Sequence, residues 1–141
     1  MCIRDRSSCF ILGKGKNEAI AKEGALKIKE IAYIHAEGFS SSSLKHGPFA
    51  LIEENLPIII LDVDVENREK NKNAYQEIMA RNAFIMRISD TSEGELKIDK
   101  NVTFGGVIAN IYIQLLSYTL SVQKGYNPDF PKNLAKVVTV E

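Results

Sequence analysis

The chain has 141 residues, of which 45% are hydrophobic and 26% are charged. This is the composition of one globular domain with a sizeable core, and it excludes a disordered chain. Eighteen Lys and Arg side chains balance eighteen Asp and Glu side chains, so there is no basic field to hold a nucleic acid, and no such partner is expected.

Membrane and extracellular classes are also disfavoured. The longest apolar run, residues 56–61, is far short of the roughly 20 residues that a membrane span requires, which predicts no membrane partner. Cys2 and Cys9 have no CxxC spacing and no nearby histidine, so neither a disulfide framework nor a metal site is expected. The charged opening MCIRDR lacks the apolar stretch of a secretory signal, which leaves the cytoplasm as the expected compartment.

The first part of the chain predicts a strand, a glycine turn and a helix. An apolar run at residues 9–12 is followed by Gly13-Lys14-Gly15 and then by a helical pattern over residues 18–34. The turn is too short for a dinucleotide fingerprint, because the third glycine of GxGxxG would fall on Glu18. No nicotinamide or flavin cofactor is therefore expected.

The rest of the chain continues the alternation. Apolar runs at 57–63 and 84–88 predict buried strands on either side of a helix over 66–81, and a polar loop at 90–100 leads to a weak strand near 96–104. Residues 107–124 are apolar almost all round, which suits a helix in a core or at a subunit interface, and 126–141 are predicted only as an extended arm. This order predicts an α/β three-layer fold with a mostly parallel sheet.

Ligands of such sheets bind beyond the carboxyl ends of the strands, here at Gly13-Lys14-Gly15 and in the loop after Val63. A second place to look is the first helix, where Glu23, Lys27 and Glu30 share one stripe because they are spaced i, i+4 and i+7. Four apolar positions lie on the opposite side: Ala21, Ala25, Ile28 and Ala32.

Two interpretations of the stripe stay open. In the plain one, which spacing alone favours, it is a solvated face whose Glu–Lys pair contributes about 0.2–0.5 kcal/mol. In the other, the stripe faces a cleft, where Lys27 stabilises a neighbouring carboxylate and Glu30 acts as a base on a carbon acid.

Three further candidates carry weaker signals. His46 lies in Lys45-His46-Gly47-Pro48, a turn just before an apolar helix, where a lone histidine is more often structural or exposed than catalytic. The serines at 40–43 could bind a phosphate, although a serine run is usually only a loop. Lys136 could form a Schiff base with a sugar carbonyl, although a lysine in a surface tail is the commoner case.

The runs EGALKIKEIAYIHAE at 23–37 and LKHGP at 44–48 closely resemble the second sugar-isomerase (SIS) subdomain of glucosamine-6-phosphate synthases, the glutamine:fructose-6-phosphate aminotransferases. The ending NLAKVVTVE at 133–141 resembles the C-terminal signature of that family. The resemblance implies an SIS-type, flavodoxin-like fold, here incomplete. It also implies a foreign segment at 1–8, part of the second SIS subdomain at 9–125, and an active-site tail at 126–141.

The resemblance also implies an activity. The family converts fructose 6-phosphate and ammonia released from glutamine into glucosamine 6-phosphate, without a metal or an organic cofactor. Glu30 matches the residue that moves a proton between C1 and C2 of the sugar imine, with Glu23 and Lys27 as charged neighbours that bind the substrate. His46 matches the histidine linked to ring opening, and Lys136 matches the lysine that forms an imine with the open-chain ketose.

Partners follow from the same resemblance. In the family the histidine of the KHGP loop reaches the site of the neighbouring subunit, so a homodimer is expected. The glutaminase domain and the first SIS subdomain, which supplies most phosphate contacts, are expected to be missing, so this polypeptide alone should be inactive.

Two alternatives remain. One is another SIS enzyme, such as a phosphosugar isomerase or deglycase, against which the ending at 133–141 argues. The other is a non-catalytic module that senses a phosphosugar, which the retention of all five candidate side chains makes less favourable.

Overall fold

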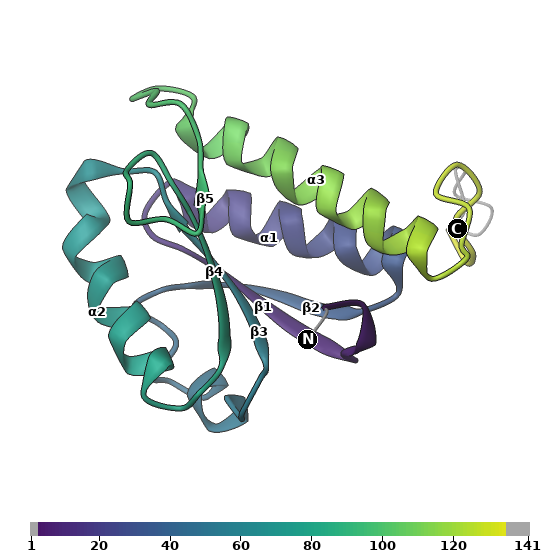
Figure 1. Cartoon of the computed structure of the whole chain (residues 1–141), viewed down its shortest axis with the longest axis horizontal. Coiled ribbons are helices and arrows are strands. Elements are labelled where there is room, and N and C mark those ends of the chain that lie inside the picture. The colour runs from purple at the N-terminus through teal and green to yellow at the C-terminus, as the bar shows by residue number, and fades with distance from the viewer. Residues whose placement is uncertain (1–2, 135–141) are drawn as a thin grey trace, which may run out of the picture.

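The computed structural model describes residues 3–134, which form one five-stranded sheet (Figure 1). The strands are β1 (Ser8–Gly13), β2 (His35–Ser40), β3 (Pro57–Asp62), β4 (Phe84–Ser89) and β5 (Leu96–Lys97). They are ordered β2-β1-β3-β4-β5, and every neighbouring pair is parallel. The predicted α/β fold with a parallel sheet is confirmed.

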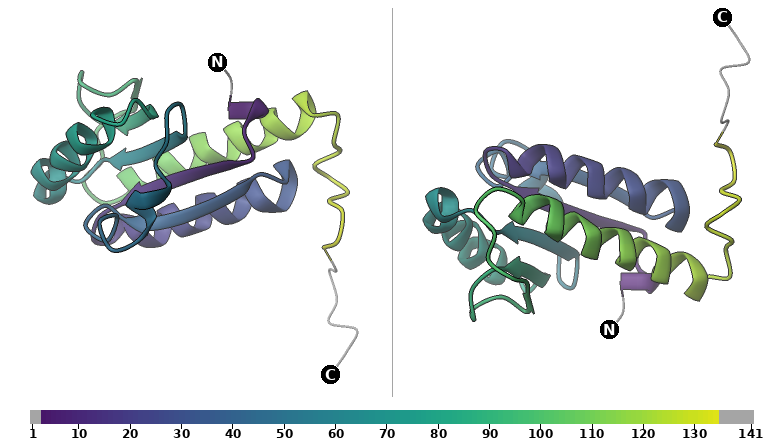
Figure 2. Two further views of the ribbon diagram at one scale, coloured as in Figure 1. Left: turned by 90° about the horizontal axis from the view of Figure 1, so that it is seen from below. Right: turned by 90° about the horizontal axis from the view of Figure 1, so that it is seen from above.

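Helices cover both faces of the sheet. Within the described part of the chain the α-helices are α1 (Asn17–Lys27), α2 (Arg68–Met79) and α3 (Gly105–Gln123). Helices α1 and α3 lie side by side on one face and α2 lies on the other (Figures 1 and 2). Shorter turns are the π-helical turn Ile28–Ala32, which continues α1, and the 3-10 turns Ile3–Asp5, Pro48–Leu51 and Val65–Asn67. The result is three layers.

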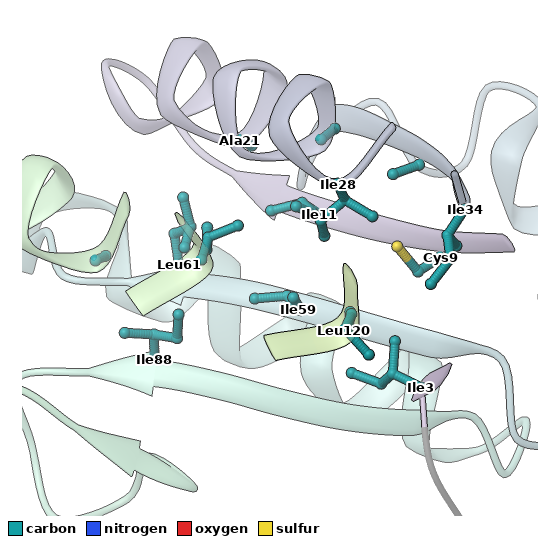
Figure 3. Close-up of a cluster of buried hydrophobic side chains, with 14 of the residues drawn as sticks. Ile3, Cys9, Ile11, Ala21, Ile28, Ile34, Ile59, Leu61, Ile88 and Leu120 are labelled. Atoms are coloured by element: carbon teal, nitrogen blue, oxygen red, sulfur yellow. The ribbon is translucent and has the colours of Figure 1, made fainter. Parts of the chain in front are cut away.

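Strand β3 explains why the core has two halves. All six of its residues are buried, because helices cover both sides of the sheet. Ile59 and Leu61 point into the cluster beneath α1 and α3 (Figure 3), and Ile58 and Ile60 point into the cluster on the α2 side. A strand buried on both faces has no polar side to show, and this is why residues 57–63 form an uninterrupted apolar run.

Two predicted helices are shorter than expected. The first was expected to reach residue 34, but Tyr33 ends the π-helical turn with a positive φ of 53°, and β2 begins at His35. Strand β2 was missed because its sequence HAEGFS has too few apolar residues to predict a strand; pairing with all six residues of β1 makes it one. The apolar helix expected after His46 is only the turn Pro48–Leu51, because the chain turns into β3 within a few residues.

Ile3 belongs to the core. Its side chain is buried in the cluster that contains Leu120 of α3 and Cys9 of β1 (Figure 3). Burial also raises the pKa of the Cys9 thiol to about 12, which keeps this thiol protonated and unreactive. The division of the chain at residue 8, and the incompleteness of the sheet, stay predictions.

Helix α3 is long and apolar enough to pass a length-and-composition test for a membrane span. It packs against α1 and the sheet, however, and Ala109, Ile113 and Leu120 are buried in the core. The buried helix of a globular protein passes the same test, so the feature does not by itself indicate a membrane.

Gly38 lets α1 approach the sheet closely, so a methyl group added at this position should destabilise the fold strongly. A Cβ at Gly38 would lie 2.5 Å from the backbone nitrogen of Lys22, whereas the nearest atoms to one at Gly24 belong to side chains, Ile113 at 2.9 Å and Ile11 at 3.4 Å. Backbone cannot yield without moving the helix, so we expect Gly38→Ala to lower the free energy of unfolding by about 2–3 kcal/mol. The matched Gly24→Ala should cost less than about 1 kcal/mol, because alanine favours the helix. Urea unfolding measures both, and equal losses would contradict this account.

Candidate functional site

Glu30 lies in the π-helical turn that follows α1, at the amino-terminal edge of the sheet. Helix α1 starts after the carboxyl end of β1 and runs back along it, so its last turn precedes His35, which pairs with Ser8 at the start of β1. Single π-helical turns are rare and occur frequently at functional sites. The fold therefore places this carboxylate at the edge opposite to the one that the parallel-sheet rule indicates.

Lys27 forms ion pairs with both glutamates of the stripe, Glu23 and Glu30. Its Nζ donates a hydrogen bond to Glu30 Oε2 at 2.9 Å and lies 3.4 Å from Glu23 Oε1. The hydrogen bond to Glu30 raises the pKa of Lys27 despite partial burial, with both carboxylates adding to the effect, so the side chain stays an ammonium. The Glu30 side chain is 25% exposed. The opposite positions are all buried, as predicted: Ala21, Ala25, Ile28 and Ala32.

Glu30 lines a hollow of about 320 Å³. The remaining lining residues come from the end of the α1 segment and from the tail: Leu26, Lys29, Tyr33, Lys132, Asn133 and Leu134. Lys27 supports the Glu30 carboxylate from beside this hollow. The interpretation in which the stripe faces a cleft thus has a geometric basis at Glu30. Lys136 lies outside the described residues.

The tail docks on Tyr33, which the sequence analysis did not single out. The hydroxyl oxygen of Tyr33 accepts a hydrogen bond from the backbone N–H of Lys132. The ring of Tyr33 packs edge-to-face on Tyr126, with 4.8 Å between the centroids. A tyrosine carries no sequence signal for a left-handed turn, where glycine or asparagine is usual, so only the coordinates reveal this contact.

His46 is exposed in the connection after β2, at the carboxyl edge of the sheet. Its backbone N–H donates to the carbonyl of Ser43 at 3.0 Å. Glu30 lies before β2 and His46 after it, and a six-residue strand spans about 20 Å. Within one chain the fold therefore does not bring the imidazole to Glu30.

The serine run divides into two halves. Ser40 and Ser41 are buried, and Ser41 donates its hydroxyl to Asn71 Oδ1 at 2.8 Å. Ser41 and Ser42 line a shallow hollow of about 250 Å³ with Lys45 and Lys70. The plain interpretation thus fits Ser40, which is buried, and Ser41, whose hydroxyl bonds within the protein.

The hollow at the carboxyl edge lies where the sequence pointed. It measures about 410 Å³ and is lined by Gly15 and by the loop 63–67, among others. Three of its polar side chains already bond to protein neighbours: Lys16 to the carbonyl of Val102, Asp64 to Asn67 and the amide of Glu66, and Asp90 to Arg68. Among residues 3–134, no three His, Cys, Asp or Glu side chains are placed to hold a metal ion. This geometry assigns no reaction to the carboxyl edge.

A match to one protein-family model shows to which family the chain belongs. The family model described as SIS domain matches residues 2–122. The chain belongs to the SIS domain family. Its five-stranded parallel sheet with helices on both faces is the SIS fold seen in solved relatives.

The relatives give a narrower likeness. The chain is 46% identical over 143 residues to a glutamine–fructose-6-phosphate aminotransferase (isomerizing) of Acanthamoeba polyphaga mimivirus, and the alignment covers 97% of the chain but 24% of the relative. This SIS chain thus spans about a quarter of that relative.

Two solved structures share the fold. The C-terminal domain of glucosamine-fructose-6-phosphate aminotransferase from Francisella tularensis has a TM-score of 0.79 and 34% identity, over 88% of this chain and 38% of that one. Glucosamine-6-phosphate deaminase from Thermotoga maritima has a TM-score of 0.83 over 98% of this chain and 42% of that one; at 22% identity it shows the fold alone.

Asp62, at the end of β3, makes stability depend on pH. It is buried, and burial raises the pKa of its carboxyl although Asn71, Arg68 and Ser89 favour the anion. The folded protein thus binds a proton at Asp62 more tightly than the unfolded chain does. This protonation stabilises the fold fully below the ordinary pKa of the unfolded chain, and the stabilisation is lost as pH rises through the raised pKa of the folded protein.

We therefore expect wild type to gain stability relative to Asp62→Asn as pH falls from 7 to 3.5. Thermal unfolding of both proteins across this range measures the difference. Asp99→Asn, at an exposed position, controls for the loss of one charge. A difference between wild type and Asp62→Asn that stays constant with pH would contradict the prediction.

Proposed function

We propose that this SIS chain is part of the sugar-isomerising site of a glutamine:fructose-6-phosphate aminotransferase. The substrate would be fructose 6-phosphate, the product glucosamine 6-phosphate, and the compartment the cytoplasm. Support comes from the likeness to such enzymes over 97% of the chain. The observation that carries the proposal is the Glu30 carboxylate, held by Lys27 beside the hollow into which the tail leads.

The chemistry suits these residue types. The amine of Lys136 would add to the C2 carbonyl of the open-chain ketose and, with loss of water, form an imine. Exchange of this imine with ammonia releases the lysine and leaves the amino-sugar imine. An imine at C2 acidifies the hydrogens on C1, so Glu30 can remove one as a general base and return a proton at C2.

Lys27 has a supporting role in this proposal. It stays an ammonium next to Glu30, at 2.9 Å, and so stabilises the carboxylate that must accept the proton. Glu23 also pairs with this ammonium, with 3.4 Å between Glu23 Oε1 and Lys27 Nζ. Both side chains would also bind the substrate through its hydroxyl groups.

His46 enters through a homodimer in this proposal. The imidazole lies at the opposite edge of the sheet from Glu30, so it can assist ring opening only in the site of a neighbouring subunit. The exposed position of the loop makes it free to do so. Exposed apolar side chains on α3, among them Ile111, Leu115 and Tyr118, offer a surface for burial against other parts of the enzyme.

The other three quarters of the enzyme would supply the remaining functions. The chain corresponds to 24% of the mimivirus relative, and we propose that the glutaminase and most phosphate contacts belong to the rest. The purified 141-residue chain should then make no glucosamine 6-phosphate from fructose 6-phosphate and glutamine, because ammonia and the phosphate anchor are lacking. Mass spectrometry of the products is the measurement. Detectable synthesis would contradict the proposal.

Replacing Glu30 tests the proton transfer. In the complete aminotransferase that contains this segment, Glu30→Gln should lower sugar isomerisation by at least about 100-fold, because the amide cannot accept the proton. Hydrolysis of glutamine should stay within about twofold of wild type, because it uses a separate site. Both rates are measured on the same preparation.

The matched control is Glu18→Gln. Glu18 pairs with Lys22 at 2.8 Å on the same helix but away from the hollow, so its loss should leave both rates unchanged. If Glu30→Gln lowered both activities equally, Glu30 would have a folding role instead.

Another SIS enzyme remains a second candidate function. The basis for this candidate is the SIS family model, which matches residues 2–122 and does not by itself specify an aminotransferase. A panel of phosphosugars assayed with the complete enzyme would separate a deaminase or isomerase from an aminotransferase, since only the last requires glutamine or ammonia.

A further inference from the structure

The backbone at Tyr33 is unusual for its residue type. With φ 53° and ψ 36°, Tyr33 has the left-handed conformation that tyrosine seldom adopts. Such conformations persist only where the surroundings fix them, and they cluster at functional sites. Here the residues on both sides, Ala32 and Ile34, are fully buried, so the core fixes the backbone and presents the Tyr33 side chain at the surface.

The side chain of Tyr33 makes a hydrogen bond and ring contacts with the tail. Its hydroxyl accepts the Lys132 N–H, its ring packs edge-to-face on Tyr126, and the Lys132 ammonium lies 4.9 Å from the Tyr126 centroid and 5.9 Å from that of Tyr33. One side chain thus joins two points of the tail to the turn that carries Glu30. Leu134, two residues beyond Lys132, lines the same hollow as Glu30.

We propose that Tyr33 is a positioning residue, which holds the tail on the Glu30 turn and thereby supports imine formation by the tail. The role in imine formation rests on the function proposed above; the attachment of the tail does not. Lys132, the other lysine of the tail, has its ammonium over the rings of Tyr33 and Tyr126, so its side chain belongs to the attachment of the tail. The imine of the proposed function is therefore assigned to Lys136.

Hydrogen exchange tests the attachment directly. In the 141-residue chain, Tyr33→Phe keeps the ring and removes the oxygen that accepts the Lys132 N–H. The Lys132 amide should then exchange at least about tenfold faster by NMR, because its protecting bond is lost. Tyr118→Phe removes a hydroxyl from an exposed tyrosine of α3 and should leave this rate unchanged. An unchanged rate in Tyr33→Phe would overturn the inference.

Imine trapping tests the positioning. The Lys136 amine adds to C2 of open-chain fructose 6-phosphate and loses water, and cyanoborohydride then delivers a hydride to the imine carbon, which leaves a secondary amine on Lys136. In the complete aminotransferase that contains this segment, Tyr33→Phe should lower the maximal rate of this labelling roughly tenfold with an unchanged half-saturating sugar concentration, because the tail is no longer held in place while the sugar contacts remain. Labelling of the exposed Lys70 on α2 serves as the internal reference.

The two measurements separate the possible failures. Faster exchange together with slower labelling at Lys136 supports the inference. Equal labelling of Lys136 in both proteins overturns the positioning role. Absence of labelling at Lys136 in wild type overturns both the imine proposed for this lysine and the positioning role, while the exchange rate still decides whether Tyr33 holds the tail.

Discussion

The close packing of α1 on β2 is the constraint on which the site depends. Gly38 has no side chain, so the backbone of α1 at Ala21 and Lys22 can cross the strand at contact distance. Because α1 starts after the carboxyl end of β1 and packs along the sheet, it runs from the carboxyl edge of the sheet to the amino edge. Since Glu30 and Tyr33 follow the last residue of α1, they can only lie at the amino edge, where the tail arrives after α3.

The two edges of the sheet are chemically different as a result. At the carboxyl edge, polar groups such as Lys16 and Asp64 are bonded to neighbouring protein groups, and they complete loops. At the amino edge, one carboxylate is held by an ammonium beside a hollow that the tail helps to build. The general rule for open α/β sheets places ligands beyond the carboxyl ends of the strands, but a fold does not by itself fix where the functional groups lie, and Glu30 lies at the amino edge.

Much of the fold could be predicted from local patterns because the physics that makes those elements is local. The run at 57–63 is apolar since β3 is covered on both faces, and the stripe of Glu23, Lys27 and Glu30 follows from helical periodicity. Strand β2 could not be predicted in the same way, because its sequence HAEGFS has too few apolar residues and only pairing with β1 makes it extended.

The sequence by itself determined the residue types for the chemistry: a Glu–Lys–Glu stripe on one helix, a histidine turn and a lysine tail, together with the alternation that makes an α/β domain. Only the tertiary structure decided which of them meet. It joined the tail to Tyr33 beside Glu30 and placed His46 at the far edge of the sheet. The physical reason is that such contacts depend on chain direction and on pairing between segments about 100 residues apart, which no local period records.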